Sequence, residues 1–244
     1  MDLPLTRSPR AERGATMQHS IRPRNDVPLI LHGDPPSFVA EQYRTLAVQI
    51  EERLNPIGSW GYALTVTSAE EGEGKTLTSL NLALTLTRGE ERRVLLLEGD
   101  LWRPQLHTYF EGDLEGTPGL QQVLDREASV SEAVIPVEGT SLDVLFAGVT
   151  QVMGDKMSGR RMSEVLAEVR AAYEVVVIDS PPLELLASAR SLSARCDGVI
   201  LVVRANRTRK RNVEKTLGTL GPEKMIGVVL NGIRLSKKGY RGYY

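Results

Sequence analysis

The segment TSAEEGEGKT carries the residues best suited to chemistry in this 244-residue chain. Gly72, Gly74, Lys75 and Thr76 fit the pattern G-x-x-x-x-G-K-[ST] of a phosphate-binding loop (P-loop), with Ala69 in place of the first glycine. Glycines let backbone N–H groups turn inward around a phosphate, while the lysine balances phosphate charge and the threonine hydroxyl holds Mg²⁺. We expect nucleotide to bind Gly72, Glu73, Gly74, Lys75, Thr76 and Leu77.

Carboxylates that could serve a metal ion follow two apolar runs. Asp179 ends the run VVVID, and two prolines then stop the strand. Glu98 and Asp100 follow the run VLLL. Because residues two apart in an extended segment face the same way, we expect Glu98 and Asp100 to be presented together beside the phosphates. The alternative for this pair is a solvated acidic turn.

The elements that would position these residues alternate along the chain. Apolar strands are predicted at residues 62–68, 92–100, 142–148, 174–179, 198–204 and 225–231, and helices at 37–54, 76–89, 160–173, 185–195 and 207–220. Strands that are apolar throughout and separated by helices indicate a parallel sheet covered on both faces. The predicted fold class is therefore α/β, a doubly wound, mostly parallel sheet of the P-loop NTPase kind.

Three regions are predicted from the composition. Residues 1–36 are rich in Arg, Pro and Ser and are expected to be a flexible arm; residues 37–233 form the P-loop domain, and residues 234–244 form a flexible tyrosine-rich tail. The 30 basic residues nearly balance the 31 acidic residues, which argues against binding to nucleic acid and against direct insertion into a membrane. The single cysteine, Cys196, cannot form an internal disulfide and is expected to be buried and inert, and the three histidines lie too far apart in sequence for a metal site.

Together, the motifs resemble those of the bacterial tyrosine kinases (BY-kinases), the CpsD/CapB-type autokinases of capsule and exopolysaccharide systems. The resemblance runs from about residue 37 to residue 244. It includes TSAxxGEGKT, the apolar run before D-x-D-x-R (here EGDLW), IDTPP (here IDSPP), a helix with E-x-x-R-x-x-R, a late GVVLN and a C-terminal tyrosine cluster.

The resemblance implies an ATP- and Mg²⁺-dependent tyrosine autokinase with roles for particular residues. Catalytic roles fall on Lys75, Glu98, Asp100 and Asp179, the metal ligands would be Thr76, Asp100 and Asp179, and Asn231 would read the adenine edge. The alternative for Asn231 is a turn former at a strand end. The phosphoacceptors would be Tyr240, Tyr243 and Tyr244, modified by a neighbouring subunit.

The sequence departs from the family pattern at several positions. In the D-x-D-x-R motif, Glu98 replaces the first aspartate, whose carboxylate is thought in the family to orient or deprotonate the incoming tyrosine. Trp102 replaces the arginine of the same motif. In the helix that mediates self-association, Glu41 and Arg44 are kept, but Ala47 replaces the last arginine, so we expect at most a weak ring. The family also implies a membrane-embedded activator of the chain-length-determinant type, which would recruit this otherwise cytoplasmic chain to the inner face of the plasma membrane.

Two other functions remain open from the sequence. A ParA/MinD-type ATPase shares the fold, but that class has an early P-loop lysine where this chain has Glu70. The basic stretch RANRTRKRNVEK could bind DNA in that class, although a charge run is more often a solvated helix face. A degenerate kinase that binds nucleotide and acts as a regulatory partner would also fit Glu98, Trp102 and Ala47.

Overall fold

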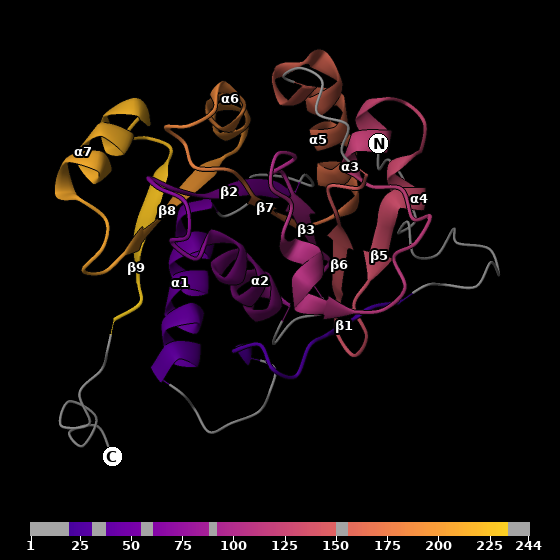
Figure 1. The fold of residues 1–244 in the computed structure, drawn as a ribbon, viewed down its shortest axis with the longest axis horizontal. Helices are drawn as coiled ribbons and strands as arrows, with labels where there is room; N and C mark the ends of the chain where they lie inside the picture. The colour runs from indigo at the N-terminus through magenta and orange to yellow at the C-terminus, as the bar shows by residue number, and fades with distance from the viewer. Residues whose placement is uncertain (1–19, 31–37, 55–60, 88–91, 150–155, 234–244) are drawn as a thin grey trace, which may run out of the picture.

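Seven strands form the central sheet of the structure, a computed structural model that describes residues 20–30, 38–54, 61–87, 92–149 and 156–233 (Figure 1). The strands are β2 (Tyr62–Ser68), β3 (Val94–Glu98), β5 (Val134–Pro136), β6 (Leu142–Leu145), β7 (Val175–Asp179), β8 (Gly198–Arg204) and β9 (Met225–Asn231). Their order is β5-β6-β3-β7-β2-β8-β9, and every neighbouring pair is parallel except β5–β6 at one edge. The predicted α/β class with a mostly parallel sheet is confirmed.

Helices cover both faces of this sheet (Figure 1). They are α1 (Phe38–Leu54), α2 (Lys75–Leu86), α3 (Leu120–Leu124), α4 (Val130–Ala133), α5 (Arg160–Ala172), α6 (Ala187–Arg195) and α7 (Lys210–Thr219), with short 3-10 helices at Leu106–Tyr109 and Lys156–Ser158. Because successive strand residues point to opposite faces, the chain builds two cores. In β2, Leu64 and Val66 pack with α1 and α2, whereas Ala63 packs with α3, α5 and α6.

Cys196 lies in the second core and is fully buried. Burial raises the pKa of its thiol to about 11, so the thiol stays protonated and inert, as the sequence predicts.

Residues 20–30 differ from the predicted flexible arm. Ile21 and Leu29 are buried, and β1 (Arg22–Pro23) pairs with β4 (Phe110–Glu111). The side chain of Asn81 in α2 accepts a hydrogen bond from the backbone N–H of Ile30 at 3.0 Å. The prediction is wrong for this stretch because its few apolar residues follow no period, although each one fills a core position. The other residues of the predicted arm, 1–19 and 31–36, lie outside the described residues.

Helix α1 carries the residues expected to mediate self-association. Glu41 and Arg44 are exposed on this helix and form an ion pair with each other at 2.6 Å. Ala47, three residues after Arg44, is 7% exposed and lies in the core shared with α2. The absence of an arginine at position 47 is therefore explained by packing within the chain, because an arginine there would have to be accommodated in the core.

None of the helices in the described part of the chain is both long enough and apolar enough to cross a membrane.

Candidate active site

The strand order brings the three predicted motifs to one edge of the sheet. The P-loop follows β2, Asp179 ends β7, and Gly99 follows β3. Asp179 lies in register with Val66 of β2 on one side and with Glu98 of β3 on the other. The backbone N–H of Gly99 donates to the carbonyl of Asp179 at 2.7 Å. Since ligands of parallel α/β sheets bind at the carboxyl ends of the strands, this edge is the expected place for a site.

The P-loop has the backbone shape that its glycines predict. Gly72 and Gly74 have φ angles of 71° and 94°, in the left-handed region that other residues rarely adopt. A Cβ atom added to Gly74 would lie 2.1 Å from Nδ2 of Asn231, so the close approach of β9 also requires glycine here. Helix α2 begins at Lys75, which points the positive end of the helix toward any bound phosphate.

A cleft of about 510 Å³ opens beside the start of α2. It is lined by Glu71, Gly72, Lys75, Thr76, Asp100, Trp102, Arg103, Gln105, Pro181, Pro182, Leu185, Leu186 and Arg207. The structure therefore brings Lys75, Thr76 and Asp100 to a single cleft. Its other walls come from the loops after β3, β7 and β8.

Asp179 does not line the cleft: it is 2% exposed and accepts a hydrogen bond from Thr76, which does line it. Burial raises the pKa of its carboxyl to about 7, the hydrogen bond from Thr76 and the charge of Lys75 oppose this shift, and the charges of Glu98 and Asp100 add to it. Taken together, a buried carboxylate, a threonine hydroxyl and the carboxylate of Asp100 form an oxygen donor set. Such sets suit Mg²⁺, which usually takes one or two carboxylates and completes its shell with water and substrate phosphates. These residues thus fit the expected metal.

Glu98 does not have the position predicted for it. Its side chain is 1% exposed, and both carboxylate oxygens accept backbone hydrogen bonds. Oε1 accepts from the N–H groups of Gln105 and Leu106 at 2.7 Å each, and Oε2 accepts from Ala147 at 3.0 Å. Burial raises the pKa of this carboxyl, while the three N–H donors lower it. Glu98 thus fixes two loops to the end of β3, and it does not line the cleft.

Asp100 is separated from Glu98 because β3 ends at Glu98. The backbone then turns, and the rule that residues two apart face the same way no longer applies. Oδ1 of Asp100 accepts the N–H groups of Trp102 at 3.2 Å and Arg103 at 3.0 Å. The prediction that Glu98 and Asp100 are presented together is therefore wrong. Asp100 lines the cleft, and Glu98 does not.

Three other residues expected to bind nucleotide have side chains engaged within the chain. Glu73 is 1% exposed, and its Oε2 accepts the N–H of Glu70 at 2.7 Å. Leu77 packs against the first core. Asn231 donates from Nδ2 to the carbonyl of Glu73 at 2.8 Å and accepts the N–H of Gly232 at 2.8 Å. These contacts agree with the alternative of a strand-end residue that supports the P-loop; its contact with adenine stays a prediction.

Glu73 also connects the P-loop to the loop between β8 and α7. Its Oε1 accepts the backbone N–H of Arg204 at 3.1 Å and the hydroxyl of Thr208. We expect Glu73→Ala to lower the free energy of unfolding by about 2 to 3 kcal/mol, because the partly buried N–H of Glu70 and hydroxyl of Thr208 lose this acceptor. Glu71→Ala is the matched control: Glu71 is exposed in an ion pair with Arg103, and its loss should cost less than about 1 kcal/mol. Urea unfolding of both variants measures the difference, and equal losses would contradict this role for Glu73.

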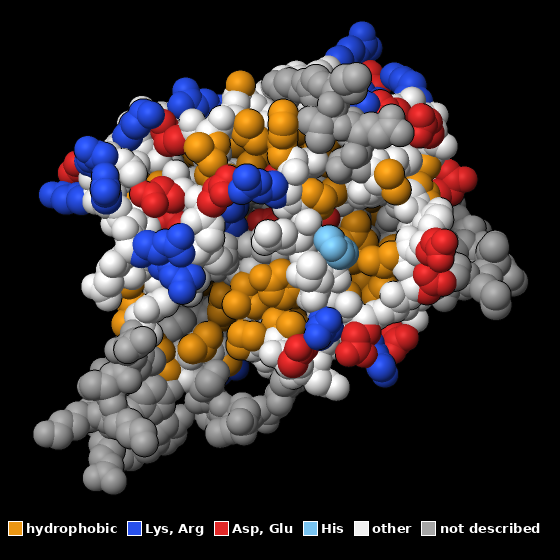
Figure 2. Space-filling model, in the orientation of Figure 1, with side chains coloured by type: hydrophobic (Ala, Val, Ile, Leu, Met, Phe, Trp, Pro, Cys, Tyr) orange, Lys and Arg blue, Asp and Glu red, His pale blue; other side chains and the backbone are white. Residues whose placement is uncertain are grey.

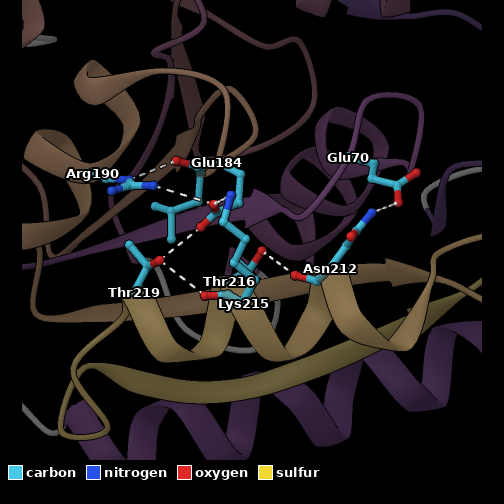
Figure 3. A network of polar contacts seen from close by, with 8 residues as sticks. Glu70, Glu184, Arg190, Asn212, Lys215, Thr216 and Thr219 are labelled. Carbon is cyan, nitrogen blue, oxygen red and sulfur yellow. Dashed lines mark hydrogen bonds and ion pairs between the residues drawn. The ribbon is translucent and has the colours of Figure 1, made fainter.

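Helix α7 braces the site from outside the cleft (Figure 3). Oε1 of Glu70, in the P-loop, accepts a hydrogen bond from the side chain of Asn212 at 2.7 Å. Glu184, in the loop after β7, accepts from Thr219 at 2.8 Å and pairs with Lys215 at 2.7 Å. One helix thus holds both the P-loop and the loop that follows Asp179. Glu70 stands where the ParA/MinD class has its lysine, and here it binds its own α7.

Sequence reasoning overlooked several residues of the cleft. Arg207 was assigned to a solvated basic stretch, yet it lines the cleft, and its guanidinium would lie 3.6 Å from a Cβ atom at Gly72. Its place just after β8, at the carboxyl edge of the sheet, is the signal that could have identified it. Of the other basic residues in the stretch, Lys215 pairs with Glu184, whereas the side chain of Lys210 is 90% exposed. Lys and Arg side chains gather at the α7 side of the molecule (Figure 2). Tyr240, Tyr243 and Tyr244 lie outside the described residues.

The chain is similar in sequence to known proteins of one family. The profile of an AAA domain family matches residues 63–221. The chain is 34% identical to tyrosine-protein kinase YwqD of Bacillus subtilis, over 96% of this chain and 95% of that protein. It is 28% identical to tyrosine-protein kinase CpsD of Streptococcus pneumoniae, over 72% of this chain and 78% of that protein.

Solved structures agree with the sequence relatives. The chimerical protein CapA2B2 is 26% identical with a TM-score of 0.75, over 90% of this chain and 95% of that chain. The VpsO kinase domain is 31% identical with a TM-score of 0.65, over 81% of this chain and all of that domain. A ParA family ATPase from Chlorobium tepidum, at 16% identity and a TM-score of 0.59, shares the fold. The chain belongs to the bacterial tyrosine-protein kinases, a family of P-loop proteins.

Proposed function

We propose that this protein is a Mg·ATP-dependent tyrosine autokinase that transfers phosphoryl groups to the C-terminal tyrosines of a second copy. The observation that carries the proposal is the convergence of Lys75, Thr76 and Asp100 on one cleft, with Thr76 hydrogen-bonded to the buried Asp179. Transfer of a phosphoryl group demands positioning and charge neutralisation more than covalent chemistry. Membership of the tyrosine-protein kinase family supports tyrosine as the acceptor.

Each residue of the cleft has a distinct task in this proposal. Inward N–H groups of the P-loop and Lys75 hold the phosphates, and Thr76 and Asp179 would hold the metal. Bound Mg²⁺ would neutralise the charge of the β- and γ-phosphates. The buried Glu98 takes no proton from the acceptor. We assign that role to Asp100, the carboxylate in the cleft, because a tyrosine hydroxyl needs only a well-placed acceptor as its charge develops.

The proposal also covers the process that the kinase controls, its activator and its self-association. The relatives named EpsB and CpsD, together with the resemblance of the motifs to capsule and exopolysaccharide kinases, support control of polysaccharide synthesis or export. A membrane-embedded activator of the chain-length-determinant type would recruit the chain to the inner face of the plasma membrane. Self-association would use the exposed face of α1 with Glu41 and Arg44, and it would be weak because these two residues already pair with each other.

Transfer between copies is expected because the tail is short and basic. Residues 234–244 span at most about 40 Å when extended, and Arg234, Lys237, Lys238 and Arg241 favour a cleft that carries the phosphates of bound nucleotide. The experiment mixes a Lys75→Ala chain that keeps its tail with an active chain truncated after Lys238. Phosphotyrosine should form on the Lys75→Ala chain in a concentration-dependent manner.

Three outcomes would count against this arrangement. Phenylalanine at all three tail positions of the acceptor chain should abolish the signal; persistent labelling would mean that the acceptors lie elsewhere. If the wild-type chain labels itself while the Lys75→Ala chain stays unmodified in the mixture, transfer occurs within one chain. If neither chain is labelled, the protein is a degenerate kinase that binds nucleotide.

A further inference from the structure

The cleft has two chemically different ends, which the strand order sets. Asp100 and Trp102 follow β3, whereas Arg207 follows β8, and β7 and β2 lie between those two strands. The lysine and metal ligands of a P-loop act on the terminal phosphates. The carboxylates lie on the β3 side, so the nucleoside must extend toward the β8 end, and the β3 end remains for another group.

Apolar side chains from the loops after β3 and its neighbour β7 line the cleft. Trp102 is 56% exposed and Leu185 is 55% exposed, and Pro181, Pro182 and Leu186 line the cleft with them. Single exposed apolar residues are ordinary on protein surfaces. Several that line one cleft, beside carboxylates and a lysine, instead form a surface that suits a ligand with an apolar body and a polar tip.

Backbone hydrogen bonds hold the loops that carry Trp102 and Leu185. Trp102 and Arg103 donate their backbone N–H groups to Asp100, which sets the turn after β3. The N–H of Leu185 donates to the carbonyl of Pro182 at 3.2 Å. Leu183, between them, donates to the carbonyl of Ser68 at 3.0 Å, which ties this loop to the start of the P-loop. The indole and the leucine side chain are therefore presented on turns that are anchored to the sheet edge.

We propose that Trp102 and Leu185 hold the phenol ring of the acceptor tyrosine, which makes Trp102 a specificity-determining residue of the kinase. This inference rests on the proposed function. The acceptor oxygen must approach the γ-phosphorus opposite the leaving group, and hence from the β3 end. As the new oxygen–phosphorus bond forms, the bond from the γ-phosphorus to the bridging oxygen breaks. ADP leaves with that electron pair, and the phenolic proton passes to Asp100.

This arrangement explains why a tyrosine is chosen over a serine. A phenol has two apolar faces that pack against an indole, and its hydroxyl lies far enough from the backbone to reach Asp100. A serine hydroxyl lies close to its own backbone, so it would leave the indole uncovered. The arginine that the family motif has at position 102 offers a cation in place of this ring, so the acceptor contact differs in this chain.

Kinetics of transfer to a separate acceptor tests the assignment. The acceptor is the Lys75→Ala chain, and the enzyme carries Trp102→Ala or Trp102→Phe. We expect Trp102→Ala to raise the KM for the acceptor by about tenfold and to leave the Kd for ADP within twofold, whereas Trp102→Phe stays near the wild type. Leu217→Ala is the control, because Leu217 is an exposed apolar residue on α7 outside the cleft, and it should change neither quantity.

A binding measurement separates this inference from the proposed function. The chain has two tryptophans, so Trp60→Phe leaves Trp102 as the only indole. Titration of the ADP-bound variant with the peptide RLSKKGYRGYY should change its fluorescence, and a peptide with alanine for the tyrosines should not. Such a change in a chain that transfers no phosphate supports the tyrosine clamp and refutes the kinase. Active transfer with unchanged fluorescence and an unchanged acceptor KM overturns the clamp, and a raised Kd for ADP alone would place the base against Trp102.

Discussion

Replacing Lys75 with alanine is expected to lower the affinity for Mg·ATP by about 10- to 100-fold, since it removes a charge-assisted contact with the phosphates. Lys75 lines the cleft at the first position of α2, and its charge already acts on Asp179. Alanine is a strong helix former, so the start of α2 should be kept. Phosphoryl transfer should fall further than binding, because negative charge is shared between the reacting oxygens in the transition state. Isothermal titration calorimetry gives the affinity.

The control for this variant removes the same charge elsewhere. Lys210 begins α7, its side chain is 90% exposed, and it pairs with Glu214 at 3.5 Å. Lys210→Ala should leave the affinity for Mg·ATP unchanged. An unchanged affinity in Lys75→Ala would contradict the assignment of the P-loop, and an equal loss in both variants would point to a general effect of charge on the protein.

Glu98→Ala is expected to lower the free energy of unfolding by about 3 kcal/mol or more, because three backbone N–H groups, two of them buried, lose their acceptor. For a domain of this size, that loss lowers the melting temperature by about 6 to 12 °C. Glu98→Gln should lie between the wild type and Glu98→Ala. Its amide oxygen can accept from Gln105 and Leu106, while its NH₂ group would face the N–H of Ala147. Differential scanning calorimetry measures all three proteins.

This result distinguishes a structural from a catalytic Glu98. A catalytic base that takes the proton of tyrosine predicts a lost rate with unchanged stability. Glu111→Ala is the matched control, because it removes an exposed carboxylate that pairs with Arg22 at 2.8 Å and should cost less than about 1 kcal/mol. Normal melting of Glu98→Ala together with lost transfer would restore the catalytic interpretation and contradict the one derived from the structure.

The central elements of the fold could be predicted from the sequence. The predicted strands at 62–68, 198–204 and 225–231 match β2, β8 and β9 residue for residue, because apolar runs bounded by turn residues leave few alternatives. The antiparallel edge strand β5 was missed: it has three residues, too few for a periodic signal. Residues 20–30 were missed for a related reason, since their core contacts depend on the rest of the fold.

The site was predictable where a local pattern determines the geometry. Gly72, Gly74 and Lys75 adopt the predicted arrangement because the P-loop is continuous in sequence. The position of Glu98 was predicted wrongly because the direction of its side chain depends on where β3 ends. It also depends on N–H donors that are distant in sequence, such as that of Ala147. Arg207 was overlooked because only the parallel order of the strands brings the loop after β8 beside the P-loop.

The measurement that tests the central claim most directly is mass spectrometry of the protein after incubation with Mg·ATP. The account predicts phosphotyrosine on Tyr240, Tyr243 or Tyr244 of the wild-type chain, and none on Lys75→Ala incubated alone. A wild-type chain that binds Mg·ATP with the affinity of a working P-loop, yet carries no phosphotyrosine at any position, would contradict the claim that this protein is a tyrosine autokinase.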